Sequence, residues 1–382
     1  MEFATWIYPW DILEEGPEAV ETRLQALGIG ELNLATNYHT VQAFTPHNPE
    51  RRTIFARASS YFDPGQEYGA LEPVPYEGMD GDWVAEIAER LTELDLTSWT
   101  VGCHNSRLGL NNRQYTLESA YGDDLVFGLC PSQPAVRTYL ATLVEDIASR
   151  EGIGRVELET FDYFYGTGFG WHHQKIHARL GTLGEFLFGL CFCPHCQSNA
   201  SAAGVDVDQV RETVVETLDG IIDGTVPHDC SPEEWLDSHA AVSAYVDVRE
   251  QTLTSLYAEL ATAAGETPLG YYVGVPDPGR EWMVGADLDE LSRYVDYYCL
   301  PAYESTGEEV MEQYGIVDDI AGDVPIHVGL LPGHPAVSDE ATVVDMLQRL
   351  SDEDVPRVSF YNYGLLPESS LEWVGNAIDA IE

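Results

Sequence analysis

Two alternating glutamates in a short apolar run are the residues of this chain best suited to acid–base chemistry. The run reads RVELET from Arg155 to Thr160. Side chains alternate along a strand, so Glu157 and Glu159 point the same way. Burying two carboxylates inside a fold is costly unless they are hydrogen-bonded or functional. Glycosidic cleavage uses such a pair, one as proton donor and one as nucleophile or base. We therefore expect Glu159, nearer the strand end, to be catalytic, with Glu157 as a further catalytic candidate or an arginine-paired structural carboxylate.

The second catalytic carboxylate is expected at the end of another strand. Glu304 follows the apolar run 295–300, and Asp11 and Asp277 follow two other runs and compete with it. Asp162 lies just beyond Glu159, where it would hold a sugar hydroxyl or tune the pair. We expect Glu304 to be the partner of Glu159.

Polar and aromatic residues also follow most of the expected strands. Ligand pockets combine aromatic surface with a few placed polar groups, and aromatic faces suit the apolar faces of sugar rings. These residues therefore predict binding of a small carbohydrate. The expected binding residues at strand ends are Trp10, Asp11, Asn37, His39, His104, Asn105, Tyr272, Tyr303, His334 and Tyr363.

A histidine-rich segment, GWHHQKIH, covers residues 170–177. It holds Lys175, the only lysine among 18 basic residues. His173 and His177 are four residues apart, a spacing used by metal ligands on one helix face. We expect His172, His173 and Lys175 to contact the substrate; a packed histidine cluster is the alternative.

Three cysteines follow at Cys191, Cys193 and Cys196, with C-x-C-x2-C spacing. Structural zinc sites take four ligands, so a fourth is required, and Cys230 and His195 are the candidates. We expect a structural zinc ion bound by the three cysteines and Cys230. The alternative is a group of reduced, buried cysteines. The glycosidase hypothesis needs no cofactor in the reaction itself.

The elements that must position these residues repeat as short strands alternating with helical segments. Such alternation indicates parallel strands joined by crossover helices. Eight strands with intervening helices predict a (β/α)8 (TIM) barrel, and a doubly wound sheet is the alternative. Ser231, followed by Pro232 and Glu234, indicates a helix start. The expected strands are 4–8, 31–36, 98–103, 155–160, 269–275, 295–300, 326–331 and 357–361.

The 382 residues exceed the length of a minimal barrel, but the excess falls in loops after the second, third and fourth strands. These loops cover residues 37–80, 104–132 and 161–230, on the face where barrels carry their active sites. We therefore predict one barrel domain spanning residues 1–382, with 161–230 as a long insertion that carries the histidine-rich and cysteine-rich segments.

The charge balance is strongly acidic, with 65 Asp and Glu against 18 Lys and Arg, a net charge of −47. The acids are spread along amphipathic segments, which indicates a solvated acidic surface. Such a surface repels itself unless molar salt screens it, so we expect the cytoplasm of a salt-accumulating halophile. The charge argues against nucleic acid and anionic membranes as partners. We find no signal-peptide pattern and no apolar run of 18 residues.

Several strings resemble a poorly characterised group of glycoside-hydrolase-like barrel proteins. They are LCPSQPAVRTYL, GRVELETFDYF, WHHQKI and LCFCPHC, between residues 129 and 200. The resemblance implies a (β/α)8 fold and carbohydrate hydrolysis, with a catalytic carboxylate at the end of strand four, which matches Glu159. The run VDYYCLPAYE is similar to strand six of chitinase-type barrels, although their D-x-x-D-x-D-x-E signature is absent.

Three hypotheses follow from these patterns. The first is a glycoside hydrolase acting on an oligosaccharide or glycoside. The second is a metal-dependent sugar isomerase or epimerase, in which His104, Glu159 and His334 would hold a divalent ion. The third is a carbohydrate-binding barrel without catalysis. The sequence leaves the sugar, the linkage and the oligomeric state open.

Overall fold

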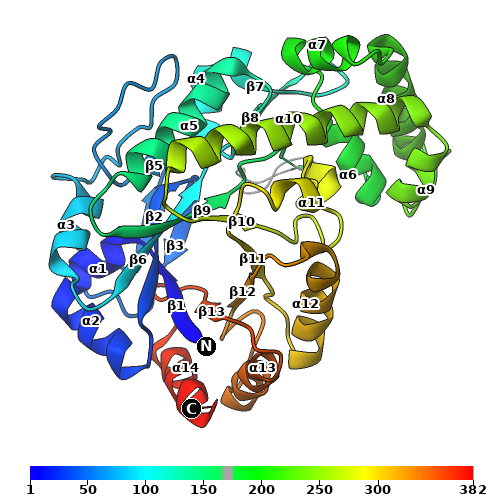
Figure 1. Ribbon diagram of the computed structural model, residues 1–382. Helices are drawn as coiled ribbons and strands as arrows, with labels where there is room; N and C mark the ends of the chain where they lie inside the picture. The colour runs from blue at the N-terminus through cyan, green and yellow to red at the C-terminus, as the bar shows by residue number, and fades with distance from the viewer. Residues whose placement is uncertain (165, 167–174, 382) are drawn as a thin grey trace.

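Eight parallel strands close into a barrel in the computed structural model, which describes residues 1–164, 166 and 175–381 (Figure 1). β1 pairs with both β2 and β13, which closes the ring. All eight predicted strands are present, so the (β/α)8 prediction is confirmed. The strands are β1 (Glu2–Ile7), β2 (Glu31–Tyr38), β6 (Asp95–Val101), β9 (Ile153–Glu159), β10 (Leu269–Tyr272), β11 (Tyr297–Pro301), β12 (Ile326–Leu330) and β13 (Arg357–Phe360).

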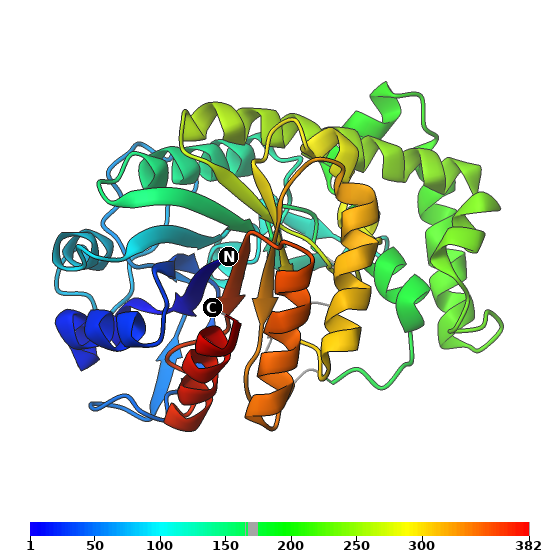
Figure 2. The same ribbon diagram turned by 60° about the horizontal axis from the view of Figure 1, so that its bottom comes forward.

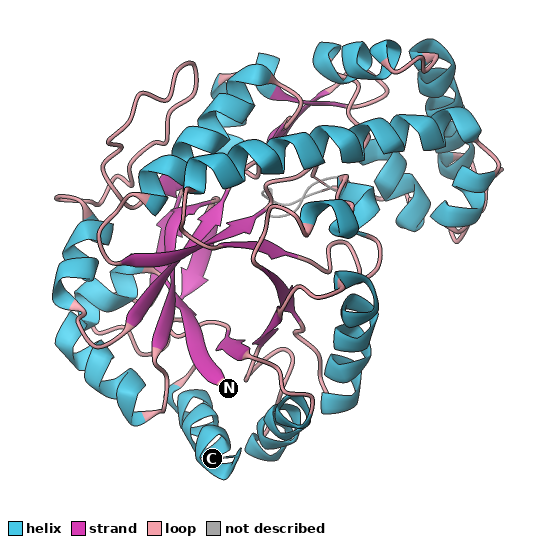
Figure 3. Ribbon diagram, in the orientation of Figure 1, coloured by secondary structure: helices cyan, strands magenta, loops and turns pink. Residues whose placement is uncertain are grey.

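Helices surround this ring of strands (Figure 3). Around the barrel lie α1 (Pro9–Glu15), α2 (Pro17–Ala26), α3 (Trp83–Arg90), α5 (Pro134–Ala148), α10 (Ala240–Ala264), α11 (Leu288–Leu291), α12 (Gly307–Ala321), α13 (Glu340–Asp352) and α14 (Glu368–Ile381). Their starts follow ordinary capping chemistry, since side chains that accept hydrogen bonds satisfy the free N–H groups of the first turn. Asp339, for example, caps α13 by accepting a bond from the Thr342 N–H.

The long loops after β2, β6 and β9 form additional elements, as their predicted ranges suggest. After β2 come a hairpin of β3 (Val41–Phe44) and β4 (Thr53–Ala56), then β5 (Ser59–Ser60), which pairs antiparallel with β2. After β6 come α4 (Ser106–Asn111), the 3-10 turn η1 (Arg113–Tyr115), β7 (Thr116–Glu118) and β8 (Asp124–Leu129). After β9 come α6 (Gly181–Gly189), α7 (Pro194–Ala202), α8 (Val207–Ile222) and α9 (Pro232–Asp237), and η2 (Glu281–Val284) follows β10. Ser231 caps α9, as predicted.

The protein buries two hydrophobic clusters. The first fills the barrel and the space beneath its helices. The second, called the second core below, lies among α6–α9, β7, β8 and the first half of α10. Figure 2 shows these helices to one side of the barrel. The 25-residue α10 joins the two clusters, because Tyr245 packs in the second core and Leu253 in the barrel cluster.

Candidate functional site

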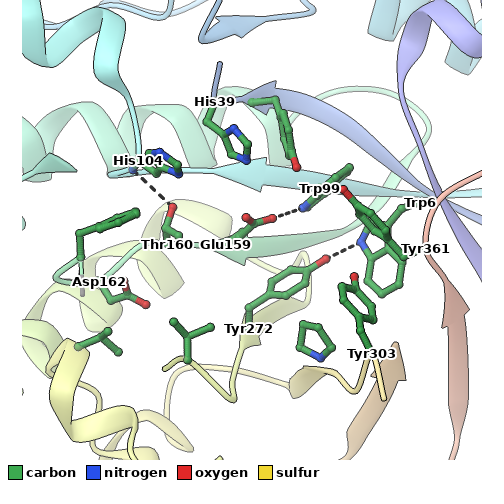
Figure 4. A pocket seen from close by; sticks show the side chains of 15 residues that line it. Trp6, His39, Trp99, His104, Glu159, Thr160, Asp162, Tyr272, Tyr303 and Tyr361 are labelled. Carbon is green, nitrogen blue, oxygen red and sulfur yellow. Dashed lines mark hydrogen bonds between the residues drawn. The ribbon is translucent and has the colours of Figure 1, made fainter. Parts of the chain in front are cut away.

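A cavity of about 290 Å³ lies at the carboxyl ends of the barrel strands, on the face where barrel enzymes place their sites (Figure 4). Its volume is at the lower end of the range for ligand pockets, which fits a ligand of about one sugar ring. Seven of the eight barrel strands, or the segments that directly follow them, contribute side chains. The lining residues are Trp6, Tyr38, His39, Trp99, His104, Glu159, Thr160, Asp162, Phe164, Tyr272, Val275, Val284, Pro301, Tyr303 and Tyr361.

Glu159, the last residue of β9, faces this cavity, as the strand alternation predicts. Its carboxylate accepts a short hydrogen bond from the indole N–H of Trp99 on the neighbouring strand β6. Burial raises the pKa of Glu159 to about 7; the Trp99 bond opposes the shift and the charge of Glu157 adds to it. A carboxyl group with a pKa near the working pH is suited to give and take protons.

Asp162 provides a second carboxyl group in the same cavity. It accepts a hydrogen bond of 3.0 Å from the hydroxyl of Tyr271. Burial raises the pKa of Asp162 to about 7, against the Tyr271 bond and the positive charge of Arg249, and the charge of Glu159 raises it further. With their pKa values raised to about 7, both carboxyls are able to exchange protons near neutral pH.

Thr160, between these carboxyls, has a φ of 53°, in the left-handed region that β-branched residues rarely adopt. Its carbonyl accepts a bond of 2.8 Å from the Cys103 N–H, and its hydroxyl accepts one of 3.4 Å from the His104 N–H. These bonds hold the strained turn that directs the chain from Glu159 toward Asp162. Strained backbone of this kind concentrates at functional sites.

Aromatic side chains form the wall of the cavity below Glu159. The indole N–H of Trp6 donates to the Tyr272 hydroxyl at 2.6 Å (Figure 4). That hydroxyl in turn donates to Glu157 at 2.7 Å. Around them, the rings of Tyr303 and Tyr361 lie 5.2 Å apart. The cavity therefore presents ring faces together with a few fixed hydroxyl groups, the composition expected of a sugar pocket.

His39 and His104 stack at the rim, with ring centroids 4.6 Å apart. Burial lowers the pKa of His39, so this ring is neutral at neutral pH. His39 bonds the carbonyl of Thr40 through Nδ1. A carbonyl only accepts, so Nδ1 donates this bond and Nε2 of the neutral ring is left to accept a hydrogen bond from a hydroxyl.

Glu157 lies in the floor of the barrel and does not line the cavity. It is 1% exposed, and its carboxylate is 3.9 Å from the guanidinium of Arg357, which is also buried. Arg357 in turn lies 3.2 Å from Glu31. This is the arginine-paired arrangement that was the alternative for Glu157, so the geometry does not support a catalytic role. Glu157 instead fixes Tyr272 beneath the substrate space.

Glu304 is the other carboxylate that the structure places differently from expectation. It lies in the segment after β11, is partly exposed, accepts a hydrogen bond from the Gln313 amide and does not line the cavity. The prediction of Glu304 as partner is therefore not supported, because its side chain turns toward α12. Asp277, an earlier competitor, pairs with Arg280.

Some of the predicted binding residues line the cavity and others do not. Those that line it are His39, His104, Asp162, Tyr272 and Tyr303. Two others form hydrogen bonds with backbone groups instead: Asn37 donates to the Val101 carbonyl, and Asn105 caps α4.

The other predicted binding residues that the structure describes do not line the cavity. Trp10 is buried against Tyr8 in the core. Asp11 is buried in α1, and burial raises its pKa to about 8. Tyr363 donates to Glu15 outside the barrel. His334 and Lys175 are exposed, and His172 and His173 lie outside the described residues.

Trp6 and Trp99 are lining residues that the sequence patterns considered above do not predict. Trp6 and Trp99 lie within strands and point inward. The alternation that placed Glu157 and Glu159 inside the barrel, applied to every strand, would have indicated these tryptophans too.

Four cysteines form a compact group in the second core. Cys130, Cys191, Cys193 and Cys196 are buried, and their sulfur atoms all lie within 4.8 Å of one another. The group is able to bind a metal ion. The predicted fourth ligand was wrong, since Cys230 is partly exposed and its thiol contacts the Ser231 carbonyl at 3.8 Å. The fourth cysteine of the group is instead Cys130, which lies 61 residues before Cys191 in the sequence.

The metal trio of the isomerase hypothesis is not assembled. His104 and Glu159 line the cavity, but His334 is exposed in the loop after β12. Over residues 1–164, 166 and 175–381, the cysteine group is the one set of three or more potential ligands close enough to share an ion.

Comparison with known proteins gives structural neighbours without sequence relatives. No protein-family model and no curated sequence matches the chain. The PgaB (BpsB) glycoside hydrolase domain from Bordetella bronchiseptica superposes with a TM-score of 0.59 at 12% identity, covering 99% of this chain and 97% of that one. A β-galactosidase from the psychrophilic Marinomonas ef1 gives 0.58 at 9% identity, covering 99% and 59%. The α-L-fucosidase isoenzyme 2 from Paenibacillus thiaminolyticus gives 0.56 at 10% identity, covering 100% and 49%.

These likenesses concern the fold. The chain is a TIM barrel of the kind found in glycoside hydrolase structures, and it spans about half to three fifths of the length of the β-galactosidase and the fucosidase. No helix within the described residues has the length and apolar character needed to cross a bilayer.

Proposed function

We propose that this protein is a glycoside hydrolase that cleaves a glycosidic bond in a small glycoside or oligosaccharide, with Glu159 and Asp162 as its paired carboxyls. The observation that supports this most is their joint position in an aromatic cavity at the carboxyl ends of the strands, each with its pKa raised to about 7. Asp162 replaces Glu304 in the pair first expected from the sequence.

The chemistry requires one protonated and one ionised carboxyl at the same time. Because burial raises the pKa of each carboxyl to about 7, protonated and ionised forms are both available near neutral pH. The protonated group would donate to the leaving oxygen, and the ionised group would serve as nucleophile or base opposite the developing oxocarbenium ion. The Trp99 and Tyr271 donors keep the two carboxyls in fixed orientations. The reaction uses no cofactor at the cavity.

The walls of the cavity would bind the sugar ring itself. Trp6, Trp99 and Tyr272 present ring surface, and His39 and Tyr303 offer groups that bond hydroxyls. A volume of about 290 Å³ fits about one ring, so the main contacts would be with the sugar on one side of the cleaved bond.

The direct test compares wild type with Glu159→Gln on a panel of aryl glycosides and oligosaccharides, assayed in molar salt. We expect wild type to release the aglycone from at least one substrate. We expect Glu159→Gln to lose about 10²–10⁴-fold in kcat, the usual contribution of acid–base catalysis.

The matched control is Glu304→Gln, the same substitution outside the cavity. It should keep kcat within about threefold of wild type, with unchanged circular dichroism in both variants. Turnover by Glu159→Gln equal to wild type, or no hydrolysis of any substrate by wild type, would contradict the proposal.

A carbohydrate-binding barrel without catalysis is the second candidate. It predicts a single carboxyl near the sugar, whereas both Glu159 and Asp162 line the cavity. Saturable binding without hydrolysis in the same panel would favour it.

We further propose that the protein works in the cytoplasm of a cell that accumulates salt. The net charge of −47 supports this, because molar salt screens charge repulsion within a few Å. The charge also disfavours nucleic acid and anionic lipid as partners.

A further inference from the structure

We propose that Cys130, Cys191, Cys193 and Cys196 bind one zinc ion as a tetrathiolate site, and that this site stabilises the second core next to Asp162. The proposal goes beyond glycoside hydrolysis and does not depend on it, since it concerns a metal site outside the catalytic cavity.

The sulfur positions match a tetrahedral zinc ion. With Zn–S bonds of about 2.3 Å, the sulfurs of a tetrahedral site lie about 3.8 Å apart. The Cys130 sulfur is 3.6 Å from Cys191, 3.6 Å from Cys193 and 3.5 Å from Cys196. These separations are far longer than a disulfide bond of about 2.05 Å. The geometry is therefore that of ligands around a common centre.

Polar groups contact the sulfurs of Cys191 and Cys196. The backbone N–H groups of Glu118 and Cys193 point to the Cys191 sulfur at 3.4 and 3.5 Å, and the Ser132 hydroxyl is 2.9 Å from the Cys196 sulfur. Such donors orient metal ligands and stabilise their charge. Since all four side chains are at most 4% exposed, the charge of several thiolates here would be costly without a bound cation.

The ligands come from two segments that lie far apart in the sequence. Cys130 follows β8, Cys191 and Cys193 precede α7, and Cys196 lies in the first turn of α7. Their separation in sequence means that a metal ion would close a loop of about 60 residues, and metal binding then contributes directly to folding.

The site also contacts the chain beside the cavity. Tyr163 follows Asp162, and its hydroxyl is 2.9 Å from Ser132 and 3.9 Å from the Cys196 sulfur. The Arg249 guanidinium lies over the Tyr163 ring at 4.5 Å. Metal binding would therefore hold the segment that carries Asp162.

The experiment measures metal in untagged protein purified under reducing conditions. We expect about one zinc per chain in wild type and in Cys230→Ser, the matched control for the ligand first predicted from sequence. We expect Cys130→Ser to lose most of its zinc and to melt at a lower temperature.

Cobalt substitution of wild type keeps the test independent of whether Cys130→Ser folds. We expect one Co²⁺ per chain with the visible bands and sulfur-to-cobalt charge transfer of a tetrahedral tetrathiolate. Reduced wild type that contains no zinc and takes up no Co²⁺ would overturn the proposal. Iron in place of zinc, or loss of zinc in Cys230→Ser, would overturn it as well. Glycoside hydrolysis is measured separately, so a failure of the zinc proposal is distinguished from a failure of the proposed glycosidase function.

Discussion

The barrel and the second core each bury a hydrophobic cluster, but different interactions hold them together. The barrel is closed by backbone hydrogen bonds between neighbouring strands, from β1 round to β13. The second core instead joins β7, β8, helices α6–α9 and the first half of α10 through side-chain packing, and it contains the cysteine group. The two carboxyls proposed as catalytic lie where these regions meet: Glu159 ends a barrel strand, and Asp162 adjoins Tyr163 of the second core.

Asp162→Asn should have the largest effect, because it changes a cavity carboxyl where the two regions meet and leaves both hydrophobic clusters unchanged. We expect kcat to fall by about 10²–10⁴-fold, because one carboxyl of the pair is lost. Asp277→Asn, the same change at an arginine-paired residue outside the cavity, should keep kcat near that of wild type.

The stability of Asp162→Asn should depend on pH in a defined direction. The pKa of Asp162 is raised in the folded protein, so its contribution to stability is full below the unfolded value near 4 and is lost as pH rises through about 7. The variant lacks this loss, and its free energy of unfolding relative to wild type should be higher at pH 8 than at pH 5. A free energy of unfolding that, relative to wild type, is lower at pH 8 than at pH 5 would argue against the assigned role of Asp162. A kcat equal to that of wild type would argue against it as well.

Trp99→Phe tests the barrel side of the junction. Removing the indole N–H takes away a donor that stabilises ionised Glu159, so the pKa of Glu159 should rise further. A hydrogen bond to a charged group contributes about 1.5–3 kcal/mol. In a plot of kcat/KM against pH, the limb that reports the titration of Glu159 should therefore move to higher pH by about one unit or more.

Trp235→Phe, in the second core, is the matched control for this shift, and its pH profile should coincide with that of wild type. An unmoved limb in Trp99→Phe would show that Glu159 does not govern the profile.

Tyr163→Phe tests the link between the two regions and should have the smallest effect. The hydroxyl removed bonds Ser132 beside the cysteine group, and one hydrogen bond contributes about 1 kcal/mol to stability. We expect a loss of that size, measured by denaturant unfolding in high salt, and a fall in kcat of no more than about tenfold. Tyr121→Phe removes a surface hydroxyl that bonds Asp219 and should change neither. If Tyr163→Phe also changes neither, the two regions are not coupled through this residue.

The two regions also differ in how far the sequence predicts them. The barrel strands follow from local alternation and apolar runs, so all eight were found, and alternation placed Glu159 at the cavity. Asp162, the partner now proposed, was predicted only to hold a sugar hydroxyl or tune the pair, because the direction of a loop side chain depends on tertiary packing. Glu304 turns to Gln313, while Thr160 bends the chain so that Asp162 enters the cavity.

The cysteine group shows the same limit. Cys191, Cys193 and Cys196 were recognised by their close spacing, but Cys130 is brought to them by the fold. A partner distant in sequence leaves no local pattern, so Cys130 was not among the predicted ligands.

The most direct test of the central claim is a crystal structure of the Glu159→Gln variant with the glycoside that wild type hydrolyses fastest. We expect the cavity of this variant to contain the intact glycoside, with one sugar ring packed against Trp99 and Tyr272. The bridging oxygen should lie within hydrogen-bond distance of the side chain at position 159, with the Asp162 carboxyl near the anomeric carbon. A glycoside bound elsewhere on the protein, with this cavity filled by water alone, would contradict the account.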